Sequence, residues 1–301
     1  MTREKTIVAL GEILWDIYPH EKHLGGAPTN SVIHAARLGA KSIVVSSVGQ
    51  DQLGDEIIET LKIYGVDTSY IQRYSARPTG TVGVKLDEKH IPHFHCSSDV
   101  AFDYIEWNDK LERLAGEIDC VITGTLAQRN RVSRKTIQRF LKRAPNAVKV
   151  FDVNFRGWSE LTSLIVQQTL IVVDILKLNE KELNQMQRAF WQEGKGTISF
   201  LDWLIEKYSL KLVALTLGEK GCFLTDGKNH IFSPGFVVDP VDTTGCGDGF
   251  LAGMTLKYLE KSSLEEMAEF ANLLGAFVAT KNGAVPEYTL RDLEEFRGRR
   301  I

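Results

Sequence analysis

The residues of this sequence best suited to chemistry lie in a glycine-rich segment of its last third, 242–248, with the sequence DTTGCGD. Gly245 and Gly247 allow a tight turn and a close backbone approach to a ligand. A helix pattern follows, and the N-terminus of a helix offers unpaired N–H groups and a positive dipole end that suit phosphate. Asp248 would repel a phosphate, so we interpret it as a base that takes a proton from a hydroxyl group during phosphoryl transfer. A plain glycine-rich loop with Asp248 as helix cap fits the same pattern.

Other nucleotide-binding motifs do not match. The sequence contains no G-x-x-x-x-G-K-[ST], which excludes a P-loop enzyme. The glycines of segment 245–249 lack the spacing of a dinucleotide-binding fingerprint and occur too late in the chain for one. The DTTGCGD segment therefore needs a different fold to position it.

The elements that must position this segment follow an alternating pattern along most of the chain. Short apolar strands are expected at 7–10, 42–48, 120–123, 148–153, 174–178 and 212–216. Helices are expected between them, at 28–38, 55–64, 133–142, 180–187 and 197–208. This alternation predicts an α/β fold with a mainly parallel sheet covered by helices on both faces.

Two hairpins interrupt the alternation. Strand patterns at 81–87 and 90–96 are joined by Glu88 and Lys89 without a helix, which is typical of a lid or an oligomer contact. A second hairpin joins 221–225 to 230–233 through an Asp-Gly turn. The C-terminal third is expected to be helical, at 244–260, 263–280 and 289–297.

Composition excludes several classes of protein. The 301 residues carry a net charge of −3 without a basic stripe, which argues against a nucleic-acid binder. The four cysteines form no C-x-x-C pair, so a disulfide framework and a cysteine zinc site are not expected. The start of the chain does not read as a signal peptide, and no apolar run reaches the roughly 20 residues of a membrane span. We therefore expect a cytoplasmic protein with no membrane partner.

A second motif makes the interpretation more specific. GGAPTN occupies 25–30, LGA follows at 38–40 and VGQDQLG at 48–54. Together with DTTGCGD, these segments resemble the PfkB (ribokinase-like) family of ATP-dependent sugar kinases over nearly the full chain. Two motifs about two hundred residues apart in the expected order are far more specific than either alone. Cys246, where alanine is more usual, and Gln50 are small departures from the family pattern.

The resemblance implies a ribokinase-like three-layer fold: a central, mostly parallel sheet flanked by helices, plus a small β lid. The whole chain, 1–301, would be a single kinase domain with lid insertions near 12–25 and 79–97. It further implies ATP and Mg²⁺. Asp248 would be the catalytic base, and the backbone of Gly245, Cys246 and Gly247 the anion hole.

The N-x-x-E motif of the family matches Asn179 and Glu182, which would order magnesium and its waters near the phosphates. Taken without the other motifs, the same pair reads as two solvated polar residues on a helix. The remaining nucleotide-binding residues implied by the resemblance are Thr216, Gly218, Gly221, Asn272 and Gly275.

A monovalent cation such as K⁺ often binds beside the anion hole in the family. In this chain the matching residues are Asp242 and Thr244, with the loop 281–285. The sequence alone leaves K⁺ binding open.

The sugar-binding residues implied by the resemblance combine carboxylate, amide and guanidinium groups, which suit hydroxyl recognition. They are Asp16, Gly26, Asn30, Phe94, Gln128, Arg129 and Arg156. For Asp16 a plain loop position is the alternative, and for Phe94 a core or dimer contact. His90, His93 and His95 with Cys96 could form a metal cluster, but alternation along a strand points them to opposite faces.

The segments GGAPTN and GEILWD resemble those of fructokinases, so the expected reaction is ATP-dependent phosphorylation of D-fructose at its 6-hydroxyl. The first alternative is 2-keto-3-deoxygluconate, whose carboxylate needs a cation such as Arg156 or Arg129, and another sugar or a nucleoside is the next. A sugar-binding regulator on a kinase scaffold is the non-enzymatic alternative. The lid hairpin predicts a homodimer, because unpaired strand edges invite partners.

Overall fold

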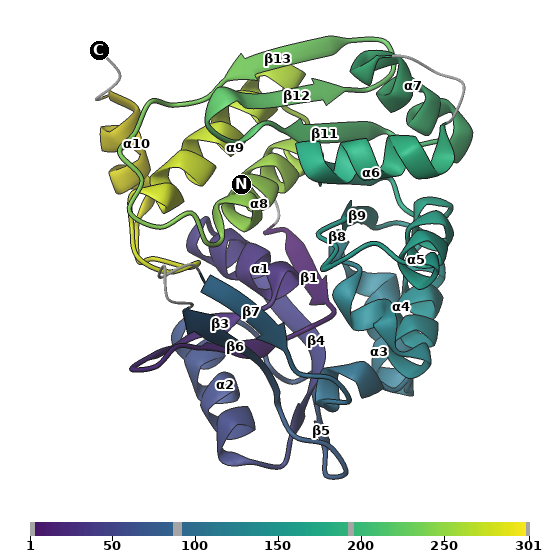
Figure 1. Cartoon of the computed structure of the whole chain (residues 1–301), viewed down its shortest axis with the longest axis vertical. Helices are drawn as coiled ribbons and strands as arrows, with labels where there is room; N and C mark the ends of the chain where they lie inside the picture. The colour runs from purple at the N-terminus through teal and green to yellow at the C-terminus, as the bar shows by residue number, and fades with distance from the viewer. Residues whose placement is uncertain (1–3, 87–91, 192–195, 299–301) are drawn as a thin grey trace.

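The structure is a computed structural model that describes residues 4–86, 92–191 and 196–298. In this part of the chain, nine strands form one sheet in the order β13-β12-β11-β10-β9-β8-β1-β4-β5 (Figure 1). Their bounds are β1 Thr6–Leu10, β4 Lys41–Gly49, β5 Ile71–Tyr74, β8 Cys120–Thr123, β9 Val148–Asp152, β10 Ile175–Asn179, β11 Leu212–Thr216, β12 Gly221–Thr225 and β13 His230–Pro234. The strands from β5 to β11 pair in parallel, and β12 and β13 are antiparallel.

Helices cover both faces of this sheet. One face carries α3 Asp109–Glu117, α4 Arg131–Arg143, α5 Glu160–Leu170, α6 Glu180–Phe190 and α7 Thr197–Tyr208. The other carries α1 Ala27–Arg37, α2 Gln52–Ile63, α8 Cys246–Leu259 and α9 Leu264–Ala279, and α10 Leu290–Gly298 packs beside α9. The three-layer α/β fold expected from the sequence is confirmed.

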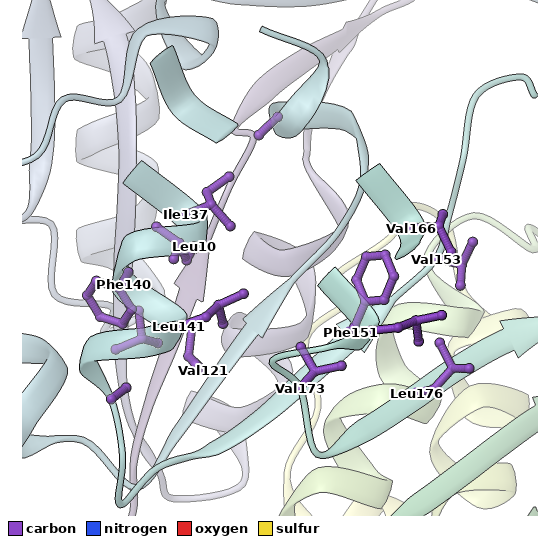
Figure 2. Packing of buried hydrophobic residues seen from close by; sticks show 14 of the residues in the cluster. Leu10, Val121, Ile137, Phe140, Leu141, Phe151, Val153, Val166, Val173 and Leu176 are labelled. Carbon is purple, nitrogen blue, oxygen red and sulfur yellow. The ribbon is translucent and has the colours of Figure 1, made fainter. Parts of the chain in front are cut away.

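The side-chain alternation of each strand divides the core between the two faces. In β1, Val8 and Leu10 join one apolar cluster, whereas Ile7 and Ala9 join the other. Figure 2 shows the first cluster, where Leu10 lies close to side chains of α4. Because both faces are buried, the parallel strands are almost continuously apolar, and a polar side chain inside one of them stands out.

A second, four-stranded sheet has the order β3-β2-β6-β7 and lies apart from the large sheet (Figure 1). It is formed by β2 Leu14–Ile17, β3 Lys22–Gly25, β6 Gly80–Leu86 and β7 Pro92–Cys96. The pairing of β6 with β7 is the antiparallel hairpin expected from the sequence. The strands β2 and β3 fall in the segment 12–25, where the other lid insertion was expected.

Several elements have the bounds expected from the sequence, such as β8 and β11, whereas others were not anticipated. The sequence analysis did not predict α3, α5, β2, β3 or β5. None of the described helices is both long and apolar enough to cross a membrane. The parallel strands β1, β8, β9, β10 and β11 end at one edge of the sheet, and the candidate site lies there.

Candidate active site

Two buried charges of opposite sign mark the carboxyl ends of β9 and β10. Asp152 and Lys177 are paired in the strand register, and the ammonium Nζ lies 3.1 and 3.0 Å from the two carboxylate oxygens of Asp152. Lys177 shares its side of β10 with Ile175, which packs in the cluster covered by α8. The sequence analysis did not identify Lys177 as a site residue, although a single charged residue inside the apolar strand ILKLN could have indicated one.

Asp248 lies in the first turn of α8, whose N-cap is Gly245. Gly245 has a φ of 77°, in the left-handed region that favours glycine, so the turn requires this residue type. The Asp248 side chain is buried, and its Oδ2 accepts a hydrogen bond of 2.8 Å from Asn30 Nδ2. Oδ1 of Asn30 is also buried and has no partner in the part of the chain that the structure describes. An open acceptor therefore lies beside the carboxylate.

Burial changes the protonation of this site. It raises the pKa of Asp248 to about 7, and the nearby negative charge of Asp152 adds to the effect, whereas Asn30, Lys177 and Arg156 oppose it. The pKa of Glu182 is also raised to about 7, by burial first and by Asp152 second. Asp248 thus has the pKa of a group that can accept a proton near neutral pH.

The backbone of Gly247, in the first turn of α8, lies beside the buried pair of Asp152 and Lys177. A Cβ added to Gly247 would lie 3.1 Å from Lys177 Nζ, so the ammonium group sits directly beside the start of α8. At this end of α8, Cys246 N donates to Thr243 O and Asp248 N donates to Gly245 O, and the helix dipole adds positive potential there. Helix N-terminus and ammonium group together make a site suited to a phosphate.

Asn179 and Glu182 form a capping box at the start of α6. Asn179 N donates to Glu182 Oε2 at 2.8 Å, and Glu182 N donates to Asn179 Oδ1 at 3.0 Å. Glu182 is only 3% exposed, so the alternative of two solvated polar residues is wrong. Its carboxylate lies close enough to Asp152 and Lys177 for their charges to shift its pKa.

The residues expected to bind sugar approach the same corner from the small sheet and α1. Asp16, in β2, lies opposite His23 of β3, and burial raises the pKa of its carboxyl. Gly26 has a φ of 115°, and a Cβ there would clash with the carbonyl oxygen of Glu12. The tight entry into α1 therefore requires glycine and brings Asn30 to Asp248.

Arg156 follows β9 in an exposed loop. Burial raises the pKa of Asp16, Asp152, Asp248 and the buried Glu12, and the positive charge of Arg156 opposes this rise in each of them. The guanidinium is therefore within electrostatic range of Asp16 and of Asp248. The sequence analysis did not single out Glu12, which is buried two residues after the end of β1.

Gln128 and Arg129, both expected to contact the substrate, have hydrogen-bond partners within the protein. Gln128 is fully buried, where its amide nitrogen donates to Gly124 O and Thr169 Oγ1. Arg129 donates from Nε and Nη2 to the two oxygens of Asp103, and its Nη2 also reaches Ser97 O. These donors therefore already bond within the fold.

The lid position Phe94 lies in β7, and its side chain is outside the described residues, as are those of His90, His93 and His95 of the expected histidine cluster. Over the residues that the structure describes, no group of three or more His, Cys, Asp or Glu side chains is arranged to hold a metal ion.

The nucleotide-side residues are spread along the other half of the same edge. Thr216 ends β11 in register with Asn179, and Gly218 and Gly221 follow with φ values of 61° and 106°. Asn272 uses its amide to hold the carbonyls of Ser233 and Pro234 at the end of β13.

Two further predicted residues surround the turn that begins α8. A Cβ on Gly275 would lie 3.1 Å from the Cys246 carbonyl oxygen, so glycine there lets α9 approach α8 closely. Asp242 accepts from Thr244 N at 2.9 Å and from Gly283 N at 3.0 Å. Asp242 therefore ties the DTTGCGD turn to the loop 281–285.

The chain is similar to several curated proteins over most of its length. It is 32% identical over 297 residues to the sugar kinase PH1459 of Pyrococcus horikoshii, covering 92% of this chain and 91% of that protein. It is 28% identical over 316 residues to fructokinase-1 of Oryza sativa subsp. japonica, covering 94% of each chain.

Solved structures agree with this result. The crystal structure of PH1459, described there as an uncharacterized sugar kinase, superposes with a TM-score of 0.85 at 30% identity and covers 97% of each chain. A fructokinase from Xylella fastidiosa with bound ATP has a TM-score of 0.86 at 21% identity, covers 98% of this chain and 99% of its own, and shares the fold. The family model described as pfkB family carbohydrate kinase matches residues 19–289, so the chain belongs to the PfkB family of carbohydrate kinases and is a phosphotransferase.

Proposed function

We propose that this kinase transfers the γ-phosphoryl group of ATP to a sugar hydroxyl, with D-fructose, phosphorylated at its 6-hydroxyl, as the first candidate. The observation that carries the proposal is the pair Asn30–Asp248. A hydroxyl group that donates to Asn30 Oδ1 or to Asp248 would lie against a carboxylate whose pKa is raised to about 7. Such a carboxylate removes the proton as the hydroxyl oxygen attacks phosphorus.

The phosphoryl side of the reaction uses the start of α8. The N–H groups of the turn and the ammonium of Lys177 stabilise the charge that develops on the transferring group. Asp152 keeps Lys177 protonated, because its charge raises the pKa of the ammonium against the effect of burial. ATP as the donor is supported by a second structure of PH1459, in complex with ATP, which has a TM-score of 0.80 at 29% identity.

The described acids fit a magnesium ion carried mainly by phosphates and water. They form no cluster of three that could hold a metal ion by themselves, and the capped carboxylate of Glu182 would act through water. When bound, the metal neutralises phosphate charge.

For K⁺, the carboxylate of Asp242 and the neighbouring loop carbonyls are a suitable set of oxygen donors. Although burial raises the pKa of Asp242, hydrogen bonds from Thr244 and Gly283 lower it by more, so the group stays ionised. Initial rates in sodium and potassium buffers test this part.

Fructose is favoured by the GGAPTN and GEILWD segments and by the relatives named fructokinase. An acidic sugar such as 2-keto-3-deoxygluconate is the second candidate, because Arg156 is exposed close to Asp16 and could meet a carboxylate. Arg129 cannot take that role without giving up its bonds to Asp103.

The test measures ADP release with Mg-ATP against fructose, 2-keto-3-deoxygluconate, ribose, tagatose and a nucleoside, each separately. We expect the highest kcat/KM with fructose, and a loss of about 10²-fold or more of this activity in the D248N variant. A preference for the acid sugar with fructose inert would reject fructose and keep the kinase. ATP binding without turnover on any acceptor would support the sugar-binding regulator.

A further inference from the structure

A buried histidine lies one helical turn beyond Asn30 on α1. His34 is fully buried, and both of its ring nitrogens are bonded: Nε2 lies 2.9 Å from the Ala284 carbonyl oxygen and Nδ1 lies 2.9 Å from the Tyr288 hydroxyl oxygen. A carbonyl can only accept, so Nε2 carries the proton and Nδ1 accepts from Tyr288. Burial lowers the pKa of His34 to about 4, so the ring is neutral under ordinary conditions.

Ala284, the residue held by His34, supports the turn that begins α8. A Cβ added to Gly245 would lie 2.5 Å from both Cα and O of Ala284, so the two backbones are in direct contact. The preceding residue, Gly283, donates its N–H to Asp242, in the same segment as Gly245. The loop 281–285 therefore backs the turn that would hold the phosphoryl group.

His34 and Asn30 act from the same face of α1, because residues four apart in a helix are neighbours. Asn30 bonds to the Asp248 carboxylate, and a Cβ on Gly249, the next residue, would lie 3.7 Å from His34 Nε2. Helix α1 therefore carries both Asn30, which bonds to Asp248, and His34, which bonds to Ala284 behind the turn 245–247. A displacement of α1 would move both together.

We propose that His34 is a positioning residue of the kinase, which fixes the Ala284 carbonyl by a hydrogen bond. Through the contact of Ala284 with Gly245, it keeps the turn 245–247 in place relative to Asn30. The inference rests on the proposed function, because it gives the turn its role in phosphoryl transfer. A residue needed only to fill the space would be apolar, since each buried ring nitrogen requires a partner.

The test compares four variants of the full chain. H34N is too short to reach Ala284, whereas H34Q places an amide nitrogen near the position of Nε2. A284G removes the methyl group that faces Gly245 and keeps the carbonyl that His34 holds. Y288F is the matched control, because it removes the other partner of His34 and leaves the Ala284 bond in place.

For each variant we would measure kcat, the KM for the sugar, the Kd for ATP without sugar, and the Tm, with kinetics run well below the Tm. We expect kcat to fall about ten- to hundredfold in H34N and A284G, because the turn acts mainly in the transition state. The KM for the sugar and the Kd for ATP should change little. H34Q should recover most of this loss, and Y288F should lose less than H34N.

Wild-type kcat in folded A284G and H34N would overturn the inference, as would a kcat in H34Q as low as that of H34N. If H34N does not fold, A284G and the comparison of H34Q with Y288F decide the question. Failure of the proposed function looks different, because the wild-type protein itself would then phosphorylate none of the sugars. An active wild type with an inactive D248N and unaffected A284G would reject the role of His34 alone.

Discussion

Two buried polar clusters near the strand ends differ in how completely their atoms are bonded. At the first, Gln128 bonds to Gly124, Thr169 and Gln138, and Arg129 bonds to Asp103. At the second, Asn30 Oδ1 has no partner among the described residues, and the pKa of Asp248 is raised to about 7. A saturated network stabilises the fold, whereas open acceptors and shifted protonation indicate a place for a ligand.

The substitution with the largest expected effect on this comparison is D248N. It keeps an oxygen that can accept from Asn30 and removes the base, so kcat should fall by about 10² to 10⁴. Steady-state ADP release with saturating ATP and sugar measures it, and circular dichroism checks the fold. Turnover near the wild-type value would show that Asp248 is not the base.

The stability of D248N sharpens the same point. The pKa of Asp248 is about 7 in the folded protein against an ordinary 3.8, so the folded chain holds this proton between pH 4 and 7 and the unfolded chain does not. The contribution of this group to stability therefore decreases as pH rises through that window. D248N cannot ionise, so its Tm should equal or exceed that of the wild type at pH 8. A Tm well below wild type there would indicate that the carboxylate is structural.

Lys177 gives the second prediction. K177M leaves Asp152 buried without its partner, which should cost about 3–5 kcal/mol of stability. The double variant D152N/K177M removes both charges and should recover most of the Tm. Its kcat should remain about 10²-fold below wild type, because a positive group beside Gly247 is still missing. Chemical denaturation and turnover separate the two effects, and an active double variant would contradict the phosphate role of Lys177.

The pH dependence of the wild type is the third prediction. With a base whose pKa is about 7, kcat/KM should fall about tenfold for each pH unit below that value. The pKa of Glu182 is also raised to about 7, so the profile of E182Q serves as the control. A profile flat down to pH 5 would mean that the base keeps an ordinary carboxyl pKa.

The smallest effect on activity is expected in the saturated cluster. R129M removes the guanidinium bonded to the buried Asp103 and should lower stability by about 1–3 kcal/mol, less than a fully buried pair, because Arg129 keeps a side-chain exposure of 25%. Its kcat should stay within about threefold of wild type if the role is structural. A large rise in the KM for an acidic sugar would instead return Arg129 to the substrate site.

The homodimer through the lid hairpin remains a prediction, and the mass of the protein in solution tests it directly. The hairpin of β6 and β7, in which β7 is an edge strand of the small sheet, predicts a homodimer through this sheet. Light scattering at micromolar concentration should give twice the chain mass of 33.7 kDa. A monomer at that concentration would remove this interface.

Much of the fold followed from local patterns. The parallel strands could be predicted because both of their faces are apolar, and α9 because Ser263 and Glu266 form its capping box. The helix α3 was missed although Asn108 caps it and Leu111 and Leu114 share one face. The strands β2 and β3 are four residues long and partly polar, so only their pairing identifies them.

By itself, the sequence determined the glycine turns and the start of α8, because left-handed backbone and helix N-termini depend on contiguous residues. Tertiary structure alone decided which side chains meet. Asn30 and Asp248 are 218 positions apart, and Lys177 and Asp152 meet only through the register of two parallel strands. The raised pKa of Asp248 has the same origin, because burial, which the sequence pattern does not show for a single carboxylate, is its main cause.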